Sequence, residues 1–245
     1  MARNLPPDRN VASTVQKLRL HYAKRGRLRF SSHRDFQRAL ERALRRAEIP
    51  MAYSAGFHPH PKVSYANAAP TGVASEAEYL EIGVAQECDP VVVRTALDNA
   101  LPEGFVVMDV VAGRTPDFVQ RLEASVWQVE LPGVSPDVAM AAAERFLATP
   151  EVIVERLTKN GVRQFDAREA VLLVDGAGSD PDCAILTLVV RHGTPSVRPD
   201  DVLLALRRVA DLVPPKPPRV TRLAQGPLDE AGTSVTDPLD PDRSS

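Results

Sequence analysis

The sequence predicts an α+β protein made of two split-βαβ domains in tandem. Stretches in which apolar and polar residues alternate indicate strands, and apolar residues at helical spacing indicate helices. These elements follow the order strand, helix, strand, strand, helix, strand over residues 15–115, and the order returns less regularly over residues 116–225. Such an order is typical of ferredoxin-like domains, so we expect a basic ferredoxin-like domain followed by a second one.

The clearest element is a helix in the first half, which follows a strand over residues 18–22. Ser32 is expected to cap the start of this helix, because Asp35 stands three residues later and can complete a capping box. Pro50 ends the helix, since proline is not tolerated in a helix interior. The apolar stripe of the helix comprises Phe36, Ala39, Leu40, Ala43, Leu44 and Ala47.

Further elements complete the first half. Residues 62–68 form an extended run, and residues 78–84 alternate between apolar and small or polar side chains as a strand does. Asp89 and Pro90 predict the start of a second helix, because proline is favoured at the first helical position. A strand over residues 105–111 closes the half.

The second half contains one strand more than the first. Ser135 with Pro136, and later Pro199, predict the starts of its two helices. The expected strands cover residues 127–131, 152–157, 170–174, 185–190 and 220–223. We expect residues 1–14 to be a flexible leader and residues 226–245 to be a disordered tail, because both contain few large apolar side chains.

Composition excludes several classes of protein. No stretch approaches the roughly 18 consecutive apolar residues that cross a bilayer, and the first residues lack an apolar signal core, which predicts a cytoplasmic protein with no membrane partner. The chain has only two cysteines, Cys88 and Cys183. We therefore expect neither a disulfide framework nor a cysteine-ligated cluster, and no cofactor or metal.

Positive charge is concentrated in the first domain. Between Lys17 and Lys62 there are 12 basic and 3 acidic residues, a net charge of +9, whereas the whole chain carries −2 and the rest therefore −11. This separation indicates an anionic partner, for which RNA is the leading candidate. An acidic protein surface remains an alternative.

Four arginines recur at helical spacing on the first helix and predict contacts with successive phosphates. Aromatic residues between basic ones favour unpaired bases, on which aromatic rings can stack, over duplex DNA. Tyr65 is a third candidate stacking face, beside Tyr53 and Phe57. The candidate nucleic-acid-binding residues are Arg25, Arg27, Arg34, Arg38, Arg42, Arg45, Tyr53, Phe57, His58, His60 and Lys62.

Three histidines are candidate catalytic residues. His33 precedes the first helix, and His58 and His60 follow it in a loop that Gly56 allows to turn. We expect one of the loop histidines to lie beside His33 and, with Arg34, to line a common pocket. Such histidines can bind zinc or perform metal-independent general acid–base cleavage of RNA, although hydrogen bonding to phosphate or backbone is commoner.

The run from residue 18 to residue 82 carries a resemblance to a known family. It contains the motif Tyr-Ser-x-Gly-Phe-x-Pro-His-Pro at residues 53–61. The run resembles the radical-SAM-linked family of unknown function, whose members occur as a C-terminal domain of a radical SAM protein or as a separate chain. This chain lacks the Cys-x3-Cys-x2-Cys cluster ligands, so the resemblance implies that any radical chemistry belongs to a partner chain.

A looser, fold-level similarity is to the RAMP group of CRISPR RNA-processing endonucleases, which also pair ferredoxin-like domains. Three hypotheses follow. The chain is a non-catalytic accessory protein that binds RNA, or the substrate of a radical SAM partner, on its basic face. Alternatively it is a metal-independent endoribonuclease, or a protein-interaction subunit. The sequence alone leaves all three open.

Overall fold

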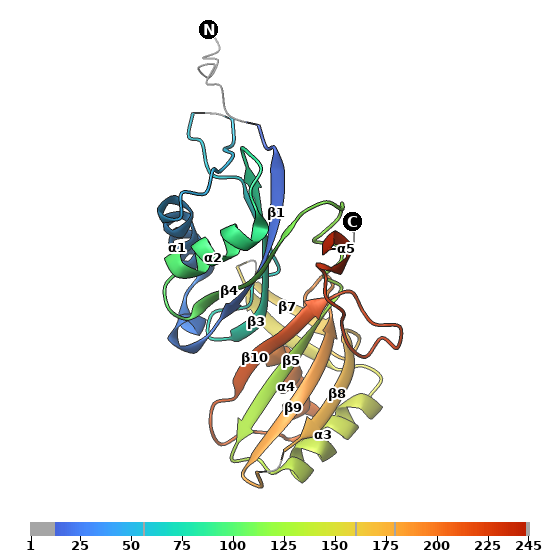
Figure 1. Ribbon diagram of the computed structural model, residues 1–245. Helices are drawn as coiled ribbons and strands as arrows, with labels where there is room; N and C mark the ends of the chain where they lie inside the picture. Colours follow the sequence, from blue (N-terminus) through green and yellow to red (C-terminus); the bar gives the residue numbers. More distant parts are fainter. Residues whose placement is uncertain (1–12, 56, 160, 179, 244–245) are drawn as a thin grey trace, which may run out of the picture. The chain divides into compact units, whose positions relative to one another are not determined.

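The structure is a computed structural model that describes residues 13–55, 57–159, 161–178 and 180–243 (Figure 1). The predicted leader therefore lies almost wholly outside the described residues, as does Gly56. The chain forms two compact units: residues 1–119 with 239–245 make unit 1, and residues 120–238 make unit 2. Helices and strands alternate in both units, which confirms the predicted α+β class.

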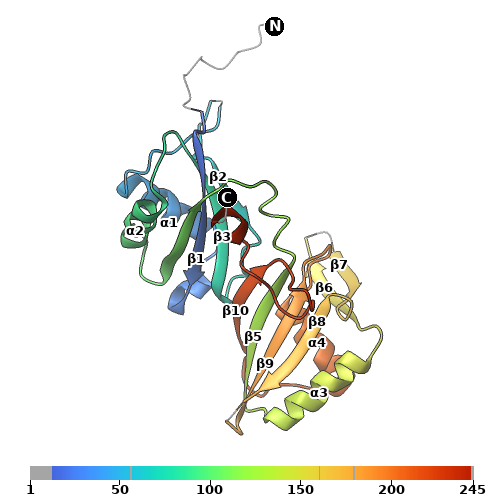
Figure 2. The ribbon, with the colours of Figure 1, turned by 45° about the vertical axis from the view of Figure 1, so that its right-hand side comes forward.

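Unit 1 has an antiparallel sheet with the strand order β4-β1-β3-β2. Helices α1 and α2 cover one face of this sheet, as two views of the ribbon show (Figures 1 and 2). The elements are β1 (Gln16–Lys24), the 3-10 helix η1 (Gly26–Phe30), α1 (His33–Arg46), β2 (Val63–Ala66), β3 (Ala74–Val84), α2 (Pro90–Ala100), β4 (Phe105–Ala112) and α5 (Asp240–Arg243).

Strand alternation decides which side chains face the helices of unit 1. Leu18 and Leu20 of β1 and Ile82 of β3 are buried in the core with α1 and α2. Successive side chains of a strand point to opposite faces, so the intervening Lys17 and Arg19 lie on the sheet face away from the helices. The helix-free face is therefore polar.

Helix α1 begins where the capping box was predicted. The Ser32 hydroxyl accepts a hydrogen bond from the backbone N–H of Asp35 at 3.2 Å, and the Asp35 carboxylate accepts one from the backbone N–H of Ser32. These hydrogen bonds, with the nearby charges of Arg38 and Arg34, lower the pKa of Asp35. The Asp35 carboxylate thus caps the start of helix α1.

Unit 2 has an antiparallel sheet with the order β10-β5-β9-β8 and a separate hairpin, β6-β7. Helices α3 and α4 pack against each other. The elements are β5 (Ala124–Pro132), α3 (Pro136–Ala148), β6 (Ile153–Thr158), β7 (Gly161–Asp166), β8 (Val171–Ala177), β9 (Cys183–Arg191), α4 (Pro199–Ala210) and β10 (Arg219–Gly226).

Strand β7 was absent from the prediction. Most of its residues are exposed, and only Phe165 is buried. A strand that buries so little shows no apolar alternation, so its sequence resembles that of a loop. The hairpin pairing with β6, from Ile153–Asp166 to Thr158–Gly161, supplies the backbone hydrogen bonds instead.

The segment after β10 corrects the expectation of a disordered tail over residues 226–245. Strand β10 includes Gly226, whose missing side chain matters because a Cβ there would lie 2.0 Å from the carbonyl oxygen of Thr236. Farther along, Leu239 is fully buried and Asp242 is 2% exposed. A few anchoring residues therefore order a segment whose average composition resembles disorder.

No helix within the described ranges combines the length and the apolar character that a membrane crossing demands.

Unit 2 contains a half-buried histidine, His192. Its Nδ1 lies 2.6 Å from the carbonyl oxygen of Leu122, which can only accept, so Nδ1 carries the proton. Its Nε2 then accepts a hydrogen bond from the hydroxyl of Ser125 at 2.7 Å. Burial, which exceeds the opposing effect of the Leu122 carbonyl, lowers the pKa of His192.

Because the folded-state pKa of His192 is lowered, His192 becomes protonated at a higher pH in the unfolded chain than in the folded chain. The free energy of unfolding of unit 2 is therefore expected to decrease as the pH falls from about 7 to about 5. Trp127, the only tryptophan and a buried residue of unit 2, reports the transition by fluorescence in urea. His192→Gln should flatten the decrease, and His21→Gln in unit 1 should leave it unchanged. An equally steep decrease in His192→Gln would contradict the assignment.

Candidate nucleic-acid interface

Helix α1 exposes a row of four arginines, which we call the arginine face: Arg34, Arg38, Arg42 and Arg45. They lie outside the apolar stripe of α1, which is buried against the sheet. Within the described residues none of the four makes a salt bridge to an acid. The arginine face therefore has unneutralised positive charge available to a partner.

Two further candidate arginines precede α1, and they differ from each other. The Arg25 Nε donates to both carboxylate oxygens of Glu76, at 2.8 and 3.0 Å, and this carboxylate raises the pKa of Arg25. A phosphate would have to compete with Glu76 for Arg25. Arg27 is exposed too, but it forms no salt bridge within the described residues.

The loop after α1 presents two aromatic side chains. Phe57 is 59% exposed and Tyr53 is 38% exposed. The base of the loop is closed by a bridge between Tyr53 and Pro61 and by a 2.9 Å hydrogen bond from the Ser54 N–H to the His60 carbonyl. Tyr53 and Phe57 are thus available for stacking on unpaired bases, as predicted for an RNA-binding loop.

Tyr65 is not available in this way. It is half-buried in the core, with its ring 6.1 Å from that of Phe36 and edge-on to His33 at 4.7 Å. Burial, together with the charge of Glu41, raises the pKa of Tyr65 well above its usual range. We therefore assign Tyr65 to packing.

The candidate histidines are engaged in different places. His33 contacts Tyr65 and, through its Nε2, the side-chain nitrogen of Gln37 at 3.0 Å. Tyr65 lies on the helix-covered face of the sheet. His60 instead lines a cavity with residues of the helix-free face, and His33, His58 and Arg34 do not line that cavity. These contacts argue against the predicted common pocket, because His33 and His60 have different neighbours.

Among the described residues, no group of three or more His, Cys, Asp or Glu side chains is placed to hold a metal ion. His58 is exposed at the loop tip. Within the part of the chain that the structure describes, the three candidate histidines therefore do not form a metal-binding group.

The cavity that His60 lines was not predicted as a unit. It has a volume of about 340 Å³. We call it the lysine pocket and define it by Thr14, Lys17, Ser54, His60, Lys62 and Gly83. Only His60 and Lys62 were candidates from sequence. Lys17 could have been placed on the same face by strand alternation, but its proximity to Lys62 depends on the pairing of β1 with β3.

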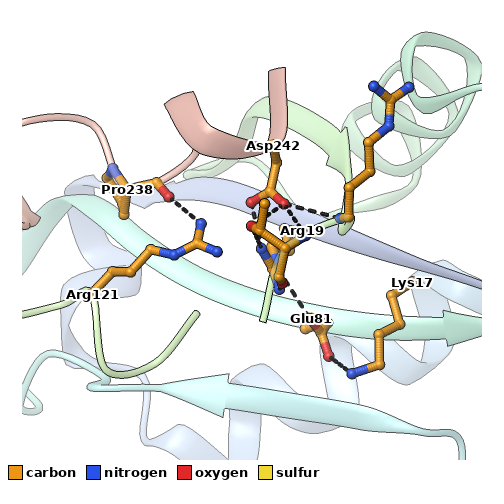
Figure 3. A network of polar contacts seen from close by, with 8 residues as sticks. Lys17, Arg19, Glu81, Arg121, Pro238 and Asp242 are labelled. Atoms are coloured by element: carbon orange, nitrogen blue, oxygen red, sulfur yellow. Dashed lines mark hydrogen bonds and ion pairs between the residues drawn. The ribbon is translucent and has the colours of Figure 1, made fainter. Parts of the chain in front are cut away.

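A buried network lies beside the lysine pocket on the same face of unit 1 (Figure 3). Lys17 forms a 2.9 Å ion pair with Glu81, and Arg19 binds the same carboxylate at 3.0 Å. Arg19 also forms an ion pair with Asp242 and lies 4.7 Å above the ring of Phe118. The guanidinium is 2% exposed, so these partners replace its hydration.

The Asp242 carboxylate receives several hydrogen bonds besides that from Arg19. The backbone N–H groups of Arg114 and Thr115 donate to it at 2.9 Å, and the Thr115 hydroxyl donates at 2.7 Å. Burial alone would raise the pKa of Asp242, but the hydrogen bonds from Thr115, Arg19 and Arg114 outweigh burial and hold that pKa far below its usual range. Asp242 is therefore a structural anion.

Fold and surface together define an α+β protein with two separate cationic surfaces on unit 1. The chain belongs to the family described as "uncharacterized protein conserved in bacteria" (DUF2344), whose model matches residues 17–199. No curated protein matches the chain. One similar solved structure is that of an unknown protein from Galdieria sulphuraria. It has 14% sequence identity and a TM-score of 0.25, and the match covers 84% of this chain and 96% of that one. We draw no functional argument from this likeness.

Proposed function

We propose that the protein is a non-catalytic accessory protein that binds single-stranded RNA through the arginine face of α1. The observation that carries this proposal is the set of four exposed arginines that form no salt bridge in the described part of the chain. Exposed charges of one sign on a rigid helix are suited to a repeating anion, because each phosphate can neutralise one side chain.

The dimensions of the arginine face suit a short stretch of backbone. From Arg34 to Arg45 the helix rises about 16 Å at about 1.5 Å per residue. This length accommodates a few successive phosphates of an extended strand. Tyr53 and Phe57, exposed in the loop after α1, supply stacking faces that an unpaired base can use and a duplex cannot.

The resemblance to the radical-SAM-linked family extends the proposal to a partner. The bound RNA, or another anionic substrate, would be presented to a radical SAM enzyme on a separate chain. The chemistry would then reside in that enzyme, in keeping with a chain that has only two cysteines. Cleavage of RNA by this chain itself is less well supported, because His33 packs against Tyr65, whereas His60 lines a cavity that His33 does not line.

Binding to RNA is expected to weaken steeply with salt. If four phosphates are neutralised, the logarithm of affinity should fall against the logarithm of salt concentration with a slope of about −2.8, at about −0.7 per contact on a single strand. Fluorescence anisotropy with an unstructured RNA, at salt concentrations spanning the physiological range, measures this slope. A duplex of the same length should bind more weakly than the single strand.

Competition with a second polymer distinguishes an RNA partner from an acidic protein partner. Polyglutamate offers carboxylates without bases, so it should compete poorly with RNA for the protein. Tighter binding to polyglutamate than to RNA would replace the RNA proposal with a protein-interaction function. Salt-independent binding of RNA would remove the arginine face from the interface.

A further inference from the structure

We propose that the lysine pocket binds a phosphate monoester group. The pocket lies on the helix-free face of the unit 1 sheet, whereas the arginine face belongs to a helix that covers the opposite side. It is therefore a second anion site, beyond the RNA-binding surface proposed above. The lysine pocket combines the ammonium groups of Lys62 and Lys17, the hydrogen-bonded pair Ser54 and His60 at its rim, and Gly83 on its floor.

Lys62 supplies a charge that no acid neutralises within the described ranges. Its Nζ donates a 3.0 Å hydrogen bond to the Thr14 hydroxyl, which is a neutral partner. An ammonium group has three donors, so two remain for a ligand. Lysine is a frequent ligand of phosphate, because its compact charge can approach one oxygen closely.

Lys17 contributes a second ammonium group to the same cavity. It is paired with Glu81, but Glu81 is also bound by the buried guanidinium of Arg19. Arg19 is also paired with Asp242, so these two cations and two carboxylates balance. Glu81 lines the cavity as well, and the net positive charge of the pocket therefore comes from Lys62. The side chain of Lys17 is 58% exposed, so its remaining donors can reach an anion in the cavity.

At the rim of the pocket, Ser54 and His60 form two hydrogen bonds with each other. The His60 N–H donates to the Ser54 hydroxyl at 3.0 Å, and the Ser54 N–H donates to the His60 carbonyl at 2.9 Å. The His60 imidazole makes no hydrogen bond in the described part of the chain. A ring held at the mouth of a cationic cavity by its own backbone is positioned to donate to a bound oxygen.

Gly83 allows Thr14 and Lys62 to pack closely against the floor of the pocket. A Cβ at this position would lie 3.1 Å from the Thr14 side chain and 3.3 Å from the Cβ of Lys62. Any larger residue would thus displace the lysine and its partner. The cavity of about 340 Å³ is at the lower end of the range for small-molecule sites, which suits a phosphate with an attached sugar.

The test is isothermal titration calorimetry of the full chain with inorganic phosphate and with adenosine 5′-monophosphate. Binding in the millimolar range is expected, and Lys62→Met should weaken it about tenfold, the loss of one charge-assisted hydrogen bond. Gly83→Ala should weaken it as well without removing charge. The control Lys216→Met removes an exposed lysine of unit 2 and should have no effect.

Absence of binding at about 10 mM ligand, or equal affinity in Lys62→Met and the control, would overturn the proposal. The source of the phosphate is decided by comparing a 5′-phosphorylated RNA with its 5′-hydroxyl counterpart. Tighter binding of the phosphorylated strand, abolished by Lys62→Met, identifies a strand end. Equal binding of the two strands, with adenosine monophosphate still bound, identifies a small phosphorylated molecule. The salt slope for RNA on the arginine face should be unchanged in Lys62→Met, which separates failure of this site from failure of the proposed function.

Discussion

Asp242→Ala is expected to lower the free energy of unfolding of unit 1 by about 3–5 kcal/mol, the usual effect of removing one partner of a buried ion pair. The substitution removes one of the two carboxylates that contact Arg19, a residue that is 2% exposed, and leaves Glu81 as the other. It also removes the acceptor for the N–H groups of Arg114 and Thr115. Hydrogen exchange of the β1 and β3 amides in the full chain measures this loss within unit 1.

Asp240→Ala is the matched control for this substitution. Asp240 stands in the same short helix and pairs with Arg243, but its side chain is 65% exposed. An exposed ion pair contributes about 0–1 kcal/mol, so the control should change little. Equal effects of the two substitutions would show that the C-terminal segment contributes only general packing.

Acid gives an independent measure of the same contact. The folded-state pKa of Asp242 is lowered, so its stabilising effect is complete above the carboxyl's ordinary pKa of about 4 and is lost as the pH falls below it. Asp242→Asn should remove that part of the acid sensitivity of unit 1. Acid titration followed by hydrogen exchange, compared with the wild type, checks this sign.

Replacing all four residues of the arginine face by glutamine is expected to reduce affinity for single-stranded RNA by two orders of magnitude or more at low salt, because about four phosphate contacts disappear together. The salt slope should fall from about −2.8 to near zero. Each side chain is exposed and makes no salt bridge, so the fold should be retained. Anisotropy titrations at several salt concentrations give both quantities.

The control must change the net charge equally without touching α1. Four exposed arginines of unit 2 serve this purpose when they are replaced together: Arg145, Arg163, Arg191 and Arg207. If this variant loses as much affinity as the α1 variant, RNA responds to overall charge and not to a defined surface. If neither variant loses affinity, the interface lies elsewhere.

Local sequence signals predicted the helices well. The Ser32 capping box and the prolines at positions 90, 136 and 199 mark helix starts that the structure contains. These signals succeed because a cap acts on backbone groups within a few residues. The expectation of a disordered tail was wrong for the opposite reason. Leu239 and Asp242 are ordered by residues far away in the chain, and composition does not reveal such contacts.

The candidate site also combines features that local sequence predicts with features that depend on the fold. Exposure of the arginine face follows from helical periodicity alone. Neutralisation of Arg25 does not, because its partner Glu76 is 51 residues away and meets it only through the fold. The lysine pocket likewise joins residues of β1, the loop before β2, and β3. Its composition depends on strand register, which a single sequence does not specify.

The pairing of Arg19 with Asp242 has a consequence for synthesis on the ribosome. The two residues are 223 positions apart. At about 5–20 residues per second, Arg19 emerges about 10–45 s before its carboxylate has been made. During that time the rest of unit 1 and all of unit 2 are available to fold, while the buried Arg19 can pair with Glu81 but not yet with Asp242. Completion of unit 1 is thereby timed to the translation of its most distant segment, after unit 2 has been translated.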